Sequence, residues 1–279
     1  MYLVYKNRNM ESKEGSTSLS LFYKEKFDSF LRNLSVAEQI KEEDIHKLRV
    51  DIKYIRSLLL LIEELNFDSD IAAKLLKQLK SIFNSAGKLR VIQVSKSLML
   101  KGGVEIPAEI MLILNRELNS KADNFKTSLT EFDLLKFKQR ITSLYSVLNK
   151  VNISELKIKV DSIIHDELEI VNRLFNSSKG EEYHHQIRKL LKVVKALEQL
   201  LLVLHDDEKR RQALDIVNAT ETSLGNWHNY KVLDNFLMKL DQELSQTGVT
   251  RVLRNLKNQN NKFKQEFKIE SDKYLRNHF

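Results

Sequence analysis

The chain has 279 residues with no cysteine, one proline and seven glycines. Without cysteine it has no disulfide, thiolate metal site or cysteine nucleophile. So few turn-forming residues argue against a β architecture. No apolar run approaches the roughly 18 residues that span a bilayer, and no apolar signal segment opens the chain. We predict a flexible leader over residues 1–18 and a cytoplasmic protein, since cysteine-free chains are compatible with reducing surroundings.

The residues that are abundant favour helices and a basic surface. Hydrophobic residues make up 42% of the chain, enough for a sizeable core, and charged residues make up 30%. Leucine, lysine, glutamate and isoleucine recur at helical spacing, so we predict an all-α fold. The net charge of +8 suits nucleic acid, anionic membrane or another polyanion as a partner, although basic character also serves solubility alone.

Hydrophobic periodicity and capping residues predict a succession of helices. The predicted ranges are 19–34, 37–65, 70–84, 88–101, 107–127, 131–149, 153–175, 181–204, 207–222, 226–244 and 250–276. Expected N-caps are Ser35, Asp68 or Ser69, and Asn152 or Ser154, with Pro107 in the first turn of its helix. Expected breaks are 85–87, 102–103, 176–180, 224–225 and 247–248.

Two of these helices carry the same histidine-led basic stripe. The first stripe comprises His46, Arg49, Lys53 and Arg56. The second comprises His185, Arg188, Lys192 and Lys195, and Lys189 widens it. All four pairs are separated by the same offset of 139 residues, which indicates an internal duplication.

The position of the stripe on its helix suggests a binding role. At about 100° per residue, the first stripe spans an arc of about 80° and about 15 Å of helix axis. It flanks the apolar face, where like charges repel each other and few acidic residues compensate. A bound polyanion would relieve this repulsion and release its counterions. A solvated face explains a single stripe; two stripes in matched register favour binding, with His46 and His185 donating hydrogen bonds to an anion.

Two glycines extend the repeat. Gly87 and Gly225 lie 138 residues apart and follow the two stripe helices in the same order. We predict that each lies at a break between helices, where positive φ is often needed. Residues 19–279 are then expected to form a single domain with related halves at about 19–150 and 151–279.

These residues resemble a known family. The segments 46–56 and 185–195 look like the paired signatures of CHAD domains, the conserved histidine α-helical domains. Gly87-Lys-Leu-Arg90 and Leu224-Gly-Asn-Trp-His228 resemble the element Leu-Gly-x-x-Arg/His that follows each signature. The resemblance covers the chain from about residue 19 to its end. Val91 and Asn229 stand where the family often has aspartate, and lysine replaces arginine at several stripe positions.

The resemblance implies two pseudo-symmetric four-helix bundles with a basic groove between them. It further implies binding of inorganic polyphosphate without catalysis or a cofactor, and association with polyphosphate granules. Both stripes would line the groove, and the additional candidates are Lys88, Arg90 and His228.

Other functions are weaker alternatives. Nucleic acid on the same basic surface is the alternative partner, although the chain lacks an aromatic platform for stacked bases. An enzyme acting on phosphate polymers is a third hypothesis, but there is no Walker or dinucleotide glycine motif and no carboxylate cluster for Mg²⁺ along the stripes. Histidines 165, 184, 185 and 205 lack metal-site spacing, so we predict no metal site. The residues Arg251, Arg254, Lys257 and Lys262 are interpreted as a solvated face. The sequence leaves the oligomeric state open.

Overall fold

The protein is described here from a computed structural model that places residues 17–177, 181–244 and 248–279. Within these ranges it is helical and contains no strand, which confirms the all-α class. The elements are α1 (Ser18–Val36), the 3₁₀ helix η1 (Ala37–Gln39), α2 (Glu42–Glu64), α3 (Ser69–Lys101), α4 (Ala108–Thr130), α5 (Leu134–Leu148), α6 (Ile153–Ser177), α7 (Glu182–Leu204), α8 (Glu208–Glu243) and α9 (Thr250–His278).

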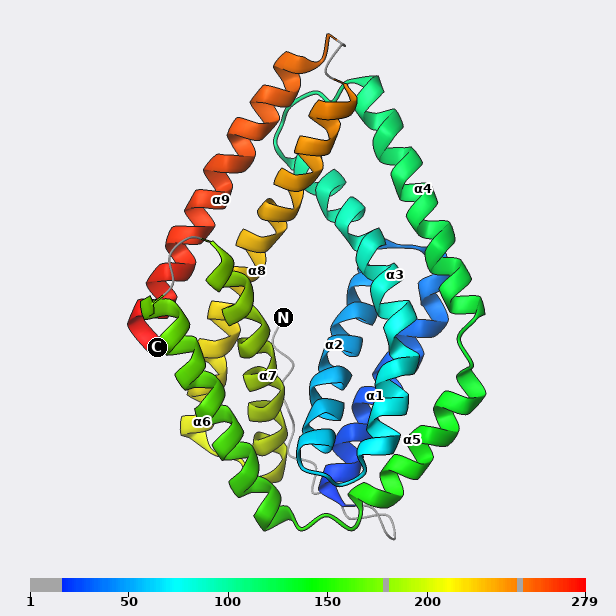
Figure 1. The fold of residues 1–279 in the computed structure, drawn as a ribbon, viewed down its shortest axis with the longest axis vertical. Helices are drawn as coiled ribbons and strands as arrows, with labels where there is room; N and C mark the ends of the chain where they lie inside the picture. Colours follow the sequence, from blue (N-terminus) through cyan, green and yellow to red (C-terminus); the bar gives the residue numbers. More distant parts are fainter. Residues whose placement is uncertain (1–16, 178–180, 245–247) are drawn as a thin grey trace.

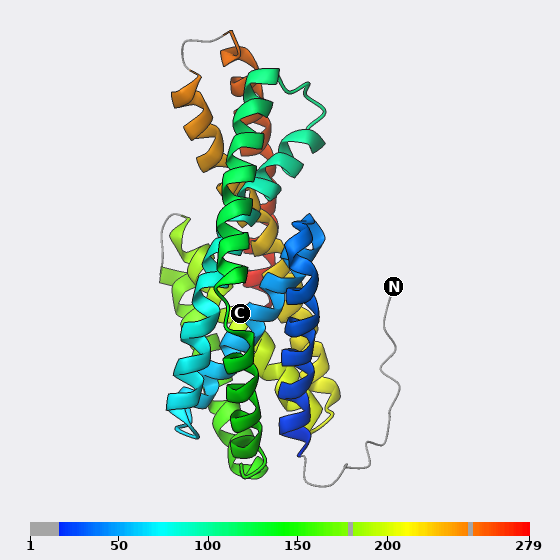
Figure 2. The same ribbon diagram turned by 90° about the vertical axis from the view of Figure 1, so that its right-hand side faces the viewer.

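The helices form two sides that meet at an apex (Figure 1). Helices α1–α5 lie on one side and α6–α9 on the other, while α2 and α7 face the middle of the molecule. The long helices α3, α4, α8 and α9 rise to the common apex. Turned by 90°, the molecule is narrow, and the apex stands above the lower helices (Figure 2). The stripe helices α2 and α7 contact each other directly.

Two hydrophobic clusters hold this arrangement together. The larger one includes residues of α1, α2, α3 and α5 together with residues of α6, α7 and α8, so it crosses between the two sides. The smaller cluster lies among α3, α4, α8 and α9 at the apex, where Met99, Leu114, Leu237 and Leu253 are buried. The apolar face predicted on the first stripe helix is buried: Ile45, Leu48, Ile52, Ile55, Leu59 and Ile62. Burial of each such side chain contributes about 1.5–3 kcal/mol, so the face fixes how α2 turns its stripe.

The predicted breaks at residues 85–87 and 224–225 are wrong. Helix α3 runs through Gly87 for 33 residues, and α8 runs through Gly225 for 36 residues. A glycine inside a helix costs about 1 kcal/mol relative to alanine, too little to end a helix whose flanking turns are packed. Neither glycine has positive φ, so backbone conformation does not require glycine at either position.

The boundary between the first two helices also differs from the prediction. Helix α1 continues to Val36, and Ser35 does not cap a new helix, because its hydroxyl donates to the Arg32 carbonyl at 2.8 Å. The chain then reverses through η1 and Ile40, whose φ is 60°. Helix α2 starts at Glu42, five residues later than expected.

Other caps agree with expectation. The Asp68 carboxylate accepts from the Ile71 amide at 3.0 Å, and the Asn152 side chain accepts from the Ser154 amide at 3.0 Å. Pro107 precedes the first turn of α4 as its N-cap and does not lie within that turn.

The predicted leader lies outside the described residues up to residue 16, and Thr17 already caps α1. Parts of two predicted breaks, residues 178–180 and 247, also lie outside them, while α6 extends to Ser177.

Candidate anion-binding site

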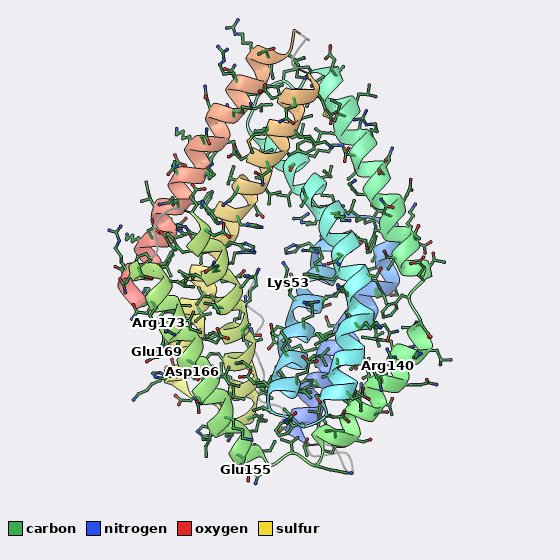
Figure 3. The ribbon with its side chains drawn as sticks, viewed as in Figure 1. Lys53, Arg140, Glu155, Asp166, Glu169 and Arg173 are labelled. Carbon is green, nitrogen blue, oxygen red and sulfur yellow. The ribbon has the colours of Figure 1, made fainter. Side chains whose placement is uncertain are left out.

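Cations from the two stripes lie close enough, in the middle of the molecule, to lower each other's pKa values. Lys53 of α2 lies between the two sides in Figure 3. Arg188 of α7 lowers the pKa of Arg49 and of Lys53, and Lys53 and Arg49 in turn lower the pKa of Lys192. We call Arg49, Lys53, Arg188 and Lys192 the cationic cluster. Its members come from positions separated by the 139-residue offset, two from each stripe.

Burial and mutual repulsion weaken the protonated forms of these side chains. Burial is the largest cause for each member, and neighbouring cations add to it for Arg49, Lys53 and Lys192. The pKa of Arg49 is lowered to about 10, that of Lys53 to about 8 and that of Lys192 to about 7. The pKa of Arg188 is also lowered by burial, although Glu221 opposes the shift. The protein therefore holds positive charge in a place where water does not fully stabilise it.

Arg49 is held against the backbone of α3. Its Nη1 donates to the Phe83 carbonyl at 2.7 Å, and its guanidinium lies 4.7 Å from the centre of the Phe83 ring. The Phe83 carbonyl is one helical turn before Gly87, so a side chain at position 87 would stand beside it. A Cβ on Gly87 would come within 2.7 Å of Arg49 Nη1. Gly87 therefore leaves room for the arginine to reach the helix backbone.

Arg188 makes a related contact with α8. A Cβ on Gly225 would meet Arg188 Nη2 at 3.4 Å and Nε at 3.5 Å. In contrast to Arg49, Arg188 lies near a carboxylate: its Nη2 is 3.5 Å from Glu221 Oε1. The same oxygen is 3.9 Å from Lys192 Nζ. Arg49 and Arg188 thus each pack on a glycine of the following helix: Arg49 lies closer to position 87 than a Cβ would allow, whereas Arg188 lies at ordinary contact distance from position 225.

The histidines near the cluster have lowered pKa values, so they add little positive charge at neutral pH. Burial, followed by nearby cations, lowers the pKa of His46 and His185. The same causes lower the pKa of His228 to about 3. The rings of His185 and His228 lie 5.2 Å apart, and His228 Nδ1 is buried without a hydrogen-bond partner among the described residues. Neutral imidazoles can still donate or accept hydrogen bonds to a bound anion.

The remaining predicted residues lie around the cluster. The Arg56 guanidinium lies 4.9 Å from the centre of the Phe83 ring, which Arg49 also contacts. Arg90 is paired with Glu42 at 2.7 Å, but it still lowers the pKa of Arg49 and of Lys53. Lys88 and Lys189 are exposed, and Lys195 is half-buried. The structure brings together the centres of both stripes and leaves these lysines at the edge.

The structure also shows groups that the sequence interpretation missed. Glu221 and Phe83 each lie four residues before one of the two glycines, so the repeat itself could have pointed to them. His184 is buried, and its Nε2 lies 2.8 Å from Asp272 Oδ1, which also accepts from the Tyr183 hydroxyl at 3.0 Å. His184 is therefore a core residue and its neighbour His185 belongs to the site.

The described part of the chain contains neither a metal-site grouping nor a membrane-spanning helix. No group of three or more histidine, aspartate or glutamate side chains there is arranged to hold a metal ion. None of the helices placed in the structure is long and apolar enough to cross a membrane.

The fold and the paired stripes define an all-helical protein with an internal cationic cluster. The family model of the CHAD domain matches residues 23–238, and the chain belongs to this family. The structure is similar to the crystal structure of the CHAD domain from the plant Ricinus communis, with a TM-score of 0.71 and 13% identity over 95% of this chain and 94% of that one. It is also similar to PptA from Streptomyces chartreusis, with a TM-score of 0.64 and 12% identity over 93% and 98% of the two chains. No curated protein matches the chain in sequence.

Proposed function

We propose that this protein binds inorganic polyphosphate without catalysis, in a basic groove lined by the two stripes. The family to which the chain belongs is associated with polyphosphate. The observation that carries the proposal is the cationic cluster: it joins four basic side chains from two helices, each with a lowered pKa, and among the described residues Glu221 is the one carboxylate within ion-pair distance of any of them. A phosphate chain would supply the negative charge that the cluster lacks.

The chemistry of the cluster fits a phosphate polymer. Arginine guanidinium groups bind phosphate oxygens in bidentate fashion, and lysine ammonium groups act as point charges. Both kinds occur in each stripe, so a linear chain running between α2 and α7 would meet cations from both sides. Because the cluster is partly shielded from water, each contact would be stronger than on an exposed helix.

The degree of burial favours polyphosphate over nucleic acid. The side chains of Arg188 and Lys192 are only 16% and 22% exposed. An unbranched phosphate chain is thin enough to reach such groups, whereas nucleic acid carries a sugar and a base on every phosphate. We further propose that the protein acts in the cytoplasm, at polyphosphate granules, and that the cluster serves binding alone because, among the described residues, it gathers cations around one carboxylate, Glu221.

The direct test replaces Arg49, Lys53, Arg188 and Lys192 together with alanine. Calorimetric titration with long-chain polyphosphate is expected to show binding by the parent that weakens steeply with salt, and no measurable binding by the variant. Each phosphate contact contributes roughly 0.7–0.9 to the slope of log K against log salt, so loss of four contacts would remove a slope of roughly three. Circular dichroism should show unchanged helix content.

A matched control separates the site from overall charge. The exposed α9 residues Arg251, Arg254, Lys262 and Lys273 provide the same number of arginines and lysines. Their replacement with alanine should leave binding within about twofold of the parent, because exposed, distant charges are screened by salt. Equal loss in both variants would mean that binding follows net charge and would refute the site. Displacement of polyphosphate by nucleic acid at equal phosphate concentration would instead favour the alternative partner.

A further inference from the structure

The two halves of the cluster differ at one equivalent position. Phe83 lies four residues before Gly87 on α3, and Glu221 lies four residues before Gly225 on α8. Each contacts the stripe arginine that packs on its glycine. One half therefore presents an aromatic ring to its arginine where the other half presents a carboxylate.

Glu221 sits among the cations but is weakly bonded to them. Its Oε1 lies 3.5 Å from Arg188 Nη2 and 3.9 Å from Lys192 Nζ, and its side chain is 15% exposed. It also raises the pKa of Lys53, against the larger effect of burial. Charge-assisted hydrogen bonds are typically about 2.7–2.9 Å long. Glu221 is therefore attracted by three cations without a short directional bond to either of the two it approaches.

The described residues of the first half provide no such counterion for its stripe. Arg49 and Arg56 both lie over the Phe83 ring. Among the described residues, no carboxylate is within ion-pair distance of Arg49, Lys53 or Arg56. The packing of Arg188 on Gly225 does not involve Glu221, so the arginine keeps a positioning contact without the carboxylate.

We propose that Glu221 is an internal competitor for phosphate that sets the affinity of the site. A phosphate chain would bind first to the cations beside Phe83 and would reach Arg188 and Lys192 only by taking the place of the Glu221 carboxylate. This inference rests on the proposed polyphosphate binding and adds that the two halves act unequally. In the protein without ligand, Glu221 would partly balance the positive charge of the cluster. The same carboxylate would lower the affinity of the site for polyphosphate.

The test compares Glu221→Gln with Glu169→Gln. Glu169 lies on the outer side of α6 and is 62% exposed, so its replacement gives the same change in net charge away from the cluster. Calorimetric titration with long-chain polyphosphate should show binding about tenfold tighter for Glu221→Gln, because the neighbouring cations no longer attract a carboxylate at about 4 Å. The salt slope should steepen by roughly one. Glu169→Gln should match the parent within about twofold.

A second pair of variants tests the same idea in the other half. Phe83→Glu introduces a carboxylate beside Arg49, and Phe83→Gln removes the ring without adding charge. Phe83→Glu should bind polyphosphate about tenfold more weakly than Phe83→Gln. Thermal unfolding of all four variants identifies any that do not fold.

The outcomes separate this inference from the proposed function. If the parent binds polyphosphate but Glu221→Gln binds equally well or more weakly, the competitor role is wrong and Glu221 is a structural partner of Arg188. If neither the parent nor Glu221→Gln binds, the proposed function fails and this inference fails with it.

Discussion

Gly87 provides the most discriminating test of how the site is built. The structure explains this glycine by the close approach of Arg49, whose Nη1 would lie 2.7 Å from an added Cβ, and not by backbone conformation. Gly87→Ala should therefore push the guanidinium away from the Phe83 carbonyl. Gly225→Ala is the matched control, because its Cβ would meet Arg188 Nη2 at 3.4 Å, an ordinary contact.

The expected magnitudes follow from two opposing effects. Alanine is favoured over glycine inside a helix by about 1 kcal/mol. A hydrogen bond that involves a charged group contributes about 1.5–3 kcal/mol, and Gly87→Ala disrupts the one between Arg49 and Phe83. Gly87→Ala should thus destabilise the protein by about 1 kcal/mol, whereas Gly225→Ala should stabilise it by about 1 kcal/mol.

Urea unfolding followed by circular dichroism measures this difference of about 2 kcal/mol directly. Polyphosphate titration should show affinity reduced about fivefold in Gly87→Ala, since the displaced Arg49 loses its position, a change of about 1 kcal/mol. Two variants that stabilise the protein equally, with unchanged polyphosphate affinity, would refute the role assigned to Gly87.

The remaining predictions concern protons. At pH 8, Lys53 and Lys192, with pKa values of about 8 and about 7, are partly neutral in the free protein. A bound polyanion favours the ammonium forms, so polyphosphate binding should take up about one proton and weaken between pH 7 and 9; identical binding heats in two buffers of different ionisation enthalpy would contradict this. Burial alone would raise the pKa of Asp272, but hydrogen bonds from His184 and Tyr183 lower it. Its stabilising contribution is therefore present above the unfolded carboxyl pKa and is lost as the pH falls through the folded value. Asp272→Ala should cost about 2–4 kcal/mol of unfolding free energy at pH 7 because it leaves His184 and Tyr183 without their hydrogen-bond acceptor. A cost below about 1 kcal/mol in urea unfolding would show that these bonds are dispensable.

Local patterns predicted much of the fold and of the site. The apolar face of α2 was readable because its period matches the helix, and burial of that face turns the stripe toward α7. The shared offset of the stripes pointed to cations that prove to influence each other's pKa values. The internal duplication suggested by that offset stays a hypothesis, as does the division into halves.

Long-range contacts could not be predicted in the same way. The breaks at Gly87 and Gly225 were inferred from the local preference of glycine, whereas the fold packs an arginine from another helix against each residue, closely enough to explain Gly87. Asp272 is separated from His184 by 88 residues, and no local period connects them. Glu221 could have been noticed through the repeat, but only the fold shows that it reaches Arg188.

The most direct test of the central claim is a crystal structure of the protein with a long polyphosphate chain. The account predicts phosphate oxygens within hydrogen-bond distance of Arg49 and Arg188 in the same complex, with the chain running between α2 and α7. A chain bound along the outer surface of α9, with no phosphate near either arginine, would contradict it.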